Sequence, residues 1–137
     1  MGFFQIKIRK TDSLFSFFIR IRDHWTCKRC KTRYPEGARG LHNSHFWGRK
    51  KAGTRFEPLN CDALCMGCHQ YFESNPELYR AWKLKQLGDE QYKRLTLQAY
   101  MIQKRDDKLI MMYICKLLNE LGVDVVKLKK RLNIKGG

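Results

Sequence analysis

Acidic residues are scarce in this chain of 137 residues, which has 13 aspartates and glutamates against 28 lysines and arginines. The formal net charge of +15 predicts a polyanionic partner. The basic residues are spread over the whole chain and interleaved with aromatic residues, whereas a membrane-surface protein would concentrate them in one amphipathic segment. We therefore expect nucleic acid as the partner, and a merely well-solvated surface is the alternative.

Long apolar runs are absent as well. The apolar stretch LFSFFI at residues 14–19 is far shorter than the roughly 18 residues that span a bilayer. No secretory signal is evident, and Gly2 lacks the Ser or Thr at the sixth position that a myristoylation signal requires. We expect a cytoplasmic protein that makes no membrane contact.

Four of the 6 cysteines form two C-x-x-C pairs, Cys27 with Cys30 and Cys65 with Cys68. In a reducing compartment such pairs favour a metal over disulfides, and a single redox motif would leave one pair unexplained. A two-residue spacer lets both thiolates of a pair reach one ion about 2.3 Å away, so two pairs complete a closed tetrahedral shell. We expect a structural Zn²⁺ ion. Cys115, in an apolar run, is expected to be a small core residue.

Hydrophobic periodicity and breaker residues predict helices separated by one strand region. A helix is expected from about residue 11, with Thr11 or Asp12 as its cap, and Pro76 and Gly88 mark the start and stop of the clearest helix. The other expected elements are a strand at 41–46 in a hairpin with the segment before it, a basic loop at 47–60, a short helix at the second cysteine pair, helical structure over 89–121 with a break near 105–108, and a basic amphipathic end at 123–137 that frays.

The order of His45, Asn60 and His69 between and beside the two cysteine pairs resembles the HNH endonuclease superfamily. The segment NCDALCMGCH at residues 60–69 is similar to the family's asparagine-to-histidine segment, and the resemblance covers about residues 24–73. The stretches SHFWGR and TRFEPLNCDALCMGCH are more loosely similar to NinG-type phage recombination proteins.

The resemblance implies an α+β fold that is mainly helical, as one domain over 1–137. It would contain an N-terminal helical arm at 1–23, a zinc-braced ββα-metal core at 24–74 and a helical C-terminal extension at 75–137. It implies DNA as the substrate, a phage setting in the host cytosol, and a phage terminase or recombination proteins as partners.

The resemblance also implies roles for single residues. His45 matches the general base, whose ordinary pKa near 6.5 suits proton abstraction at physiological pH. Asn60 matches the residue that stabilises the loop and orients the base. His69 matches a ligand of a catalytic Mg²⁺ or Mn²⁺ ion, which acts electrostatically on the phosphate and the leaving oxygen.

The chain departs from the family at Ser44, where an aspartate or histidine usually provides a second ligand. A neutral hydroxyl is a poor ligand for a hard divalent cation. Glu73, one helical turn after His69, is one candidate for the missing ligand. His42 is the other, although alternation along a strand places it on the face opposite His45. Water and the DNA phosphate are the remaining alternative.

Basic residues follow the catalytic strand, and Arg49, Lys50, Lys51 and Arg55 are expected to hold the DNA backbone, although each alone is more often a solvated charge. Trp47 is expected either to stack on a base or to close the core. The sequence thus predicts a metal-dependent DNA endonuclease of the HNH type. The alternative is a noncatalytic, zinc-stabilised module that binds nucleic acid.

Overall fold

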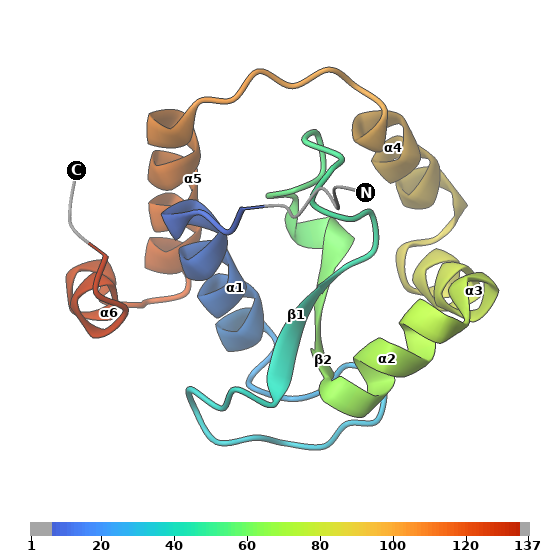
Figure 1. Ribbon diagram of the computed structural model, residues 1–137, viewed down its shortest axis with the longest axis horizontal. Coiled ribbons are helices and arrows are strands. Elements are labelled where there is room, and N and C mark those ends of the chain that lie inside the picture. The colour runs from blue at the N-terminus through green and yellow to red at the C-terminus, as the bar shows by residue number, and fades with distance from the viewer. Residues whose placement is uncertain (1–6, 135–137) are drawn as a thin grey trace, which may run out of the picture.

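A computed structural model describes residues 7–134 of the chain. A two-stranded sheet lies at the centre, with α1 and α5 on one side and α2, α3 and α4 on the other (Figure 1). The elements are α1 (Lys10–Arg22), β1 (Leu41–His45), the short 3₁₀ helix η1 (Pro58–Asn60), β2 (Cys61–Cys65), α2 (Met66–Ser74), α3 (Pro76–Leu87), α4 (Asp89–Ala99), α5 (Asp107–Glu120) and α6 (Val125–Arg131). The predicted mainly helical α+β class is confirmed.

The strands β1 and β2 pair antiparallel, with Leu41 opposite Cys65 and His45 opposite Cys61. The predicted strand is therefore confirmed, but its hairpin partner was wrong, because β1 pairs with the strand that follows it. The segment before β1 contributes one isolated bridge, between Thr26 and Arg33. Left-handed backbone at His24, Trp25 and Lys31 (φ of 56°, 54° and 65°) bends that segment back on itself.

Strand alternation divides the side chains of the sheet between two faces. His45 lies on the α1 face, where its ring centroid is 6.4 Å from that of Phe15. Ser44 and Asp62 lie on the other face, where they contact α3. Directly opposite residues of the two strands share a face, so the register decides which side chains of β1 can meet α2.

α1 begins earlier than predicted. Its N-cap is Arg9, and Asp12 stands at the third helical position, where its carboxylate accepts a hydrogen bond from Arg9 N (2.8 Å). Asp12 therefore accepts a hydrogen bond from the N-cap backbone N–H from within the first turn of the helix, as the acidic member of a capping box does. At the other end, Arg22 donates to the carbonyl oxygen of Cys61 (2.7 Å) and the Asp23 carboxylate accepts from Ala63 N (2.9 Å). These contacts attach α1 to β2.

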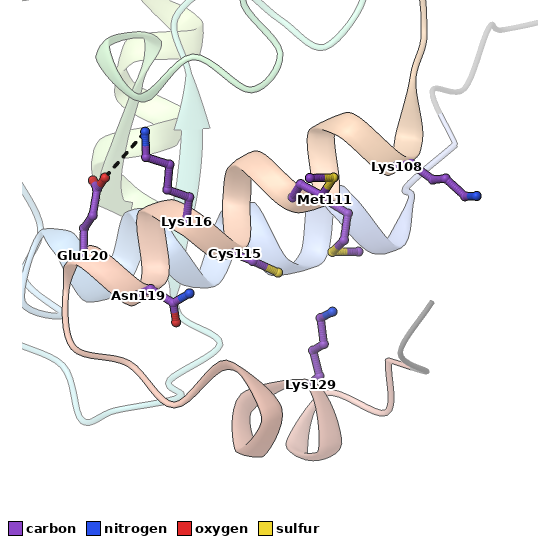
Figure 2. Close-up of a pocket in the computed structure, with 8 residues that line it drawn as sticks. Lys108, Met111, Cys115, Lys116, Asn119, Glu120 and Lys129 are labelled. Carbon is purple, nitrogen blue, oxygen red and sulfur yellow. Dashed lines mark ion pairs between the residues drawn. The ribbon is translucent and has the colours of Figure 1, made fainter.

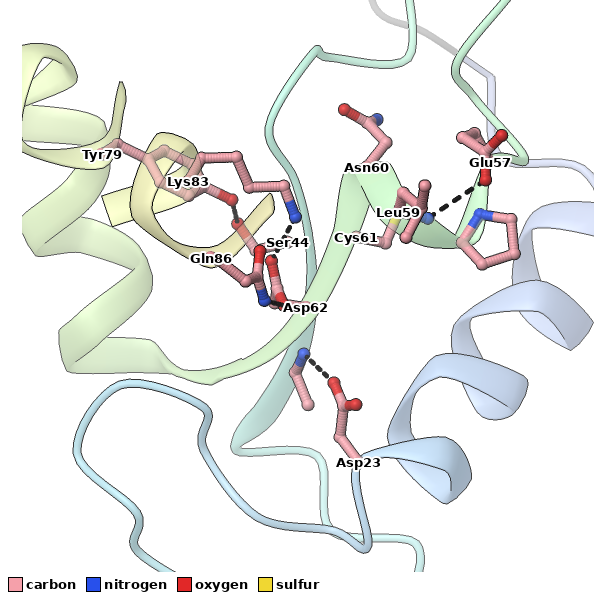
Figure 3. Close-up of polar contacts among 12 residues, drawn as sticks. Asp23, Ser44, Glu57, Leu59, Asn60, Cys61, Asp62, Tyr79, Lys83 and Gln86 are labelled. Carbon is pink, nitrogen blue, oxygen red and sulfur yellow. Dashed lines mark hydrogen bonds and ion pairs between the residues drawn. The ribbon is translucent and has the colours of Figure 1, made fainter. Parts of the chain in front are cut away.

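A buried ion pair joins β2 to α3 (Figure 3). The ammonium of Lys83 lies 2.8 Å from the Asp62 carboxylate, and each side chain is 1% exposed. Gln86 donates to the other carboxylate oxygen of Asp62 at 2.6 Å. Because both charges are desolvated, the pair is costly to break from one side.

Lys83→Met is therefore expected to lower the free energy of unfolding by about 3 to 5 kcal/mol, because it leaves the Asp62 carboxylate buried without its counter-ion. Urea unfolding followed by circular dichroism measures the loss. The double variant with Asp62→Asn should recover part of it, since no buried charge remains. A loss below about 1 kcal/mol for Lys83→Met would contradict a tightly coupled pair.

The C-terminal half is helical, as expected, and Asn75 and Gly88 flank α3 at the predicted ends. α4 and α5 are separated by residues 100–106, so the predicted break is confirmed. The predicted frayed end is wrong for 125–131, which form α6. Its N-cap Asp124 accepts from Lys127 N (3.1 Å), and Leu128 is buried. Residues 135–137 lie outside the described part of the chain.

The outer side of α5 carries a cavity of about 630 Å³, bordered also by Lys129 of α6 (Figure 2). Half-buried Cys115 lines this cavity. It packs at the edge of the core instead of inside it, because the helix directs Ile114 and Leu118 inward. Within residues 7–134, no helix has the length and apolar character needed to cross a membrane.

Candidate functional site

The four paired cysteines lie together, and their sulfur atoms are all within 4.8 Å of one another. The Sγ atoms of Cys30 and Cys65 are 3.8 Å apart. Two thiolates that each lie about 2.3 Å from one tetrahedral ion are separated by about 3.8 Å. The cluster, formed by Cys27, Cys30, Cys65 and Cys68, therefore fits a structural metal ion such as Zn²⁺.

Two local structures present the thiolates. The first pair sits in a turn in which Cys27 N donates to the Thr32 carbonyl (2.9 Å) and Lys31 N donates to the Cys27 carbonyl (2.9 Å). The second pair forms the start of α2, where Cys65 is the N-cap and its Sγ accepts from Cys68 N at 3.4 Å. A helix N-terminus favours negative charge, so this position suits a thiolate.

Nearby groups also favour thiolates. The Arg29 guanidinium donates to Cys68 Sγ at 3.4 Å and stacks on the Tyr71 ring at 3.9 Å. A hydrogen bond with the Thr32 side chain lowers the pKa of Cys30 to about 6, whereas burial raises the pKa of Cys68 to about 12. Because a metal binds the deprotonated sulfur, metal uptake by this cluster must release protons.

His45 stands at the end of β1 with one ring nitrogen occupied. Its Nε2 lies 3.0 Å from the carbonyl oxygen of Arg55, and a carbonyl only accepts, so Nε2 carries the proton. Nδ1 of the neutral ring therefore keeps its lone pair. Burial and then the positive charge of Arg49 lower the pKa of His45 to about 4. The ring is consequently neutral, and able to accept a proton, across the physiological range.

Asn60 holds the loop that follows β1. Its Oδ1 accepts from Trp47 N (2.8 Å), and its Nδ2 donates to the carbonyl oxygens of Trp47 (2.9 Å) and Thr54 (3.1 Å). The side chain is fully buried. The loop also carries the Arg55 carbonyl that binds His45, so Asn60 acts on His45 through the backbone of the loop rather than by direct contact.

His42, His69 and Glu73 meet on the opposite face of the sheet. The Nδ1 atoms of His42 and His69 are 3.1 Å apart, and His69 Nε2 lies 3.2 Å from Glu73 Oε1. Two nitrogens at about 2.1 Å from one octahedral ion lie about 3.0 Å apart. The two Nδ1 atoms are thus spaced as two ligands would be. Glu73 is placed to orient His69 from behind, as carboxylates commonly do for metal-binding histidines.

Ser44 lies on the His42 face but points into α3. Its hydroxyl is 2.7 Å from the Tyr79 hydroxyl, and the side chain is fully buried (Figure 3). Burial raises the pKa of Tyr79, which keeps the phenol neutral. A metal ion at Ser44 would have to displace this hydrogen bond. The geometry therefore favours His42 over both Ser44 and Glu73 as the second ligand beside His69.

The positive charge of Arg49 acts on both His45 and His69. It lowers the pKa of His45, second to burial, and it also lowers the pKa of His69, where burial is again the largest cause. The Nε of Arg49 is buried and has no hydrogen-bond partner among residues 7–134, while Asp12 is 3.8 Å away. His45 and His69 themselves lie on opposite faces of the sheet, and no hydrogen bond joins them within the described residues.

The other basic residues of the loop differ in availability. Arg55 is 5% exposed and forms a buried, two-pronged ion pair with Asp12, so its first role is structural and it is not free as the sequence predicted. Lys50 is exposed, and Lys51 lies over the Tyr100 ring at 4.0 Å. Trp47 packs against Phe46 and Tyr100, which favours the core-closing alternative.

Sequence reasoning missed Asp12 and Tyr79 as parts of this region. Asp12 joins Arg49 and Arg55, and Tyr79 fixes Ser44. In the sequence, Asp12 has the pattern of a helix cap and Tyr79 that of an ordinary helix residue. Both act through partners more than 30 residues away, which a local pattern does not show. No family model, curated protein or solved structure matches this chain.

Proposed function

We propose that this protein is a metal-dependent DNA endonuclease of the HNH type. The observation that carries the proposal is the pair of Nδ1 atoms of His42 and His69, which lie 3.1 Å apart and are spaced as two metal ligands would be. His45, whose ring is neutral, would supply the base of such a site, and Arg49 would supply a phosphate contact. The phage setting, with recombination proteins or a terminase as partners, rests on the sequence resemblance alone.

His45 acts as the general base in this proposal. Its Nδ1 removes a proton from the attacking water, and the Arg55 carbonyl holds Nε2–H and stabilises the imidazolium that forms. Arg49 binds a nonbridging phosphate oxygen and offsets the negative charge that grows in the transition state. Asn60 keeps the loop that carries both groups in place.

The donor set of His42 and His69 fits a divalent transition metal better than Mg²⁺, because imidazole nitrogens suit such ions and Mg²⁺ prefers oxygen. Of the two ions that the sequence resemblance implies, Mn²⁺ accepts nitrogen ligands more readily than Mg²⁺ does, so Mn²⁺ is the proposed ion. When bound, it supplies positive charge to the phosphate and the leaving oxygen. Glu73 accepts the Nε2 proton of His69 and so fixes the tautomer that exposes Nδ1.

Incubation of supercoiled plasmid with the purified, zinc-loaded protein tests the proposal. Nicked or linear product is expected with Mn²⁺, less with Mg²⁺, and none with EDTA. An absence of product with every divalent metal, from protein that still binds the plasmid, would reject the endonuclease.

Metal titration separates the ligands. His42→Ala is expected to raise the Mn²⁺ concentration needed for half-maximal nicking more than Glu73→Gln does, because it removes a ligand and not an orienting group. Glu73→Gln should lower the affinity for Mn²⁺ about tenfold. This is the low end of the effect of residues that orient a metal ligand, because the Glu73 side chain is 66% exposed. Glu77→Gln, on the exposed side of α3, is the matched control. The reverse order of the first two variants would make Glu73 the ligand.

A second candidate is a noncatalytic, zinc-stabilised module that binds nucleic acid. It is favoured by the separation of His45 and His69, which lie on opposite faces of the sheet. It is also favoured by Ser44, whose hydroxyl is hydrogen-bonded to the Tyr79 hydroxyl and is therefore not available to a metal ion. For such a module, His45→Ala and His69→Ala would change neither DNA affinity nor any product.

A further inference from the structure

A second cavity, of about 670 Å³, lies at the N-terminal end of α1 and is lined mainly by basic residues. Five cationic side chains border it, those of Lys7, Arg9, Lys10, Arg55 and Arg105, together with Asp107. Except for Arg55, none of these belongs to the region built around His45. The cavity therefore needs an explanation of its own.

Positive charge is in excess at this cavity. Asp12 is paired with Arg55, and Asp107 with Arg105 at 2.7 Å. Five cations against these two carboxylates leave a local net charge of +3. Burial, and then the charges of Arg55 and Arg105, lower the pKa of Arg9. The crowded guanidinium groups would thus be relieved by an anion.

The backbone adds to this positive potential. The first turns of α1 and α5 both border the cavity, and Arg9 of one lies 3.8 Å from Asp107 of the other. Two helix N-termini, with their positive dipole ends, thus meet beside the cationic side chains. Thr11, also on the cavity wall, is 3% exposed, and its hydroxyl has no hydrogen-bond partner among residues 7–134.

We infer that this cavity binds a phosphate group of a nucleic acid, and the identity of that carrier rests on the proposed function. Arg55 connects the two regions: its guanidinium borders the cavity, and its carbonyl accepts from His45. Asp12 lies between Arg55 and Arg49. A phosphate in the cavity would therefore be a neighbour, along the same strand, of a phosphate at Arg49. The same chemistry would also accept a free 5′-phosphate at a strand end.

The test compares two triple variants of equal charge. Lys7→Gln, Lys10→Gln and Arg105→Gln change exposed cavity residues and spare the structural Arg55. Lys116→Gln, Lys127→Gln and Lys130→Gln remove the same charge from exposed positions of α5 and α6. Binding of a labelled duplex is measured in EDTA across a salt series. The cavity variant should lower the slope of log affinity against log salt by about 1, since the cavity holds one phosphate and each lost phosphate contact lowers the slope by about 1.

Equal slopes for the cavity variant and the wild type would overturn the inference, as would an equal loss in the control variant. Because EDTA prevents cleavage, this result is independent of the nuclease. If the wild type never cleaves DNA and the cavity variant binds DNA more weakly, the proposed function is rejected but the phosphate-binding cavity is supported. A closed circular competitor, which has no ends, and duplexes with 5′-phosphate or 5′-hydroxyl then identify the phosphate. If the circle competes less well for the cavity variant than for the wild type, the cavity binds an internal phosphodiester. If the wild type prefers the 5′-phosphate duplex and the cavity variant does not, the cavity binds a strand end.

Discussion

His45→Ala is expected to slow plasmid nicking by on the order of 10² to 10⁴, because it removes the proposed general base. DNA affinity in EDTA should stay near that of the wild type, since the ring is half-buried behind the loop and carries no charge at neutral pH. Single-turnover kinetics measure the rate, and fluorescence anisotropy measures the affinity. Near wild-type cleavage by a folded His45→Ala protein would remove His45 from the mechanism.

The pH dependence of the cleavage rate distinguishes a catalytic His45 from a structural one. The pKa of His45 is lowered to about 4 in the folded protein, so the neutral base is present above that pH and is lost only as pH falls through it. The acid limb of single-turnover cleavage should therefore lie well below the ordinary histidine value near 6.5. For the same reason, the stability that the neutral, buried ring permits is present above about pH 6.5 and declines as the pH falls toward 4.

Cys27→Ser is expected to unfold the part of the chain around the four-cysteine cluster. A structural Zn²⁺ ion contributes on the order of 10 kcal/mol to folding, comparable to the whole stability of a typical domain, about 5 to 15 kcal/mol. Cys27 is fully buried and its sulfur belongs to the four-cysteine cluster, so a serine there removes a ligand that no neighbour replaces. Loss of near-ultraviolet circular dichroism and of bound zinc, measured by mass spectrometry, is the expected result.

Cys115→Ser is the matched control, because this half-buried cysteine lies on α5, outside the cluster. It should retain one zinc per chain and unfold close to the wild type. Chelator treatment of the wild type should reproduce the Cys27→Ser result. A metal-free wild type that keeps its fold and its thermal transition would show that the cluster is not a structural zinc site.

The helical frame was predictable because its signals are local. Pro76 and Gly88 fix the ends of α3 through their own backbone preferences, and the spacing within each C-x-x-C pair limits where a ligand can point. The start of α1 was misplaced because Asp12 serves the helix from its third position. The partner of β1 was also misjudged, since pairing depends on which later segment returns to the strand.

The site was less predictable, because its geometry depends on which face each side chain meets. Alternation correctly separated His42 from His45, but only the packing of α2 shows that His42 meets His69. Arg55 looked like an exposed loop cation, and its burial against Asp12 follows from the docking of α1 on the loop. The contact of Arg49 with Asp12, at 3.8 Å, has no signature in the sequence, since it depends on the course of the loop that Asn60 holds.

A double-mutant cycle of cleavage rates tests most directly whether the two faces of the sheet act on one phosphodiester. His45→Ala, His69→Ala and the double variant are compared with the wild type under single-turnover conditions in Mn²⁺, on one plasmid. Groups that act as a unit give non-additive losses, so the double variant should be about as slow as the slower single variant. Losses that multiply in the double variant, or a His69→Ala protein that cleaves at the wild-type rate, would contradict a shared site.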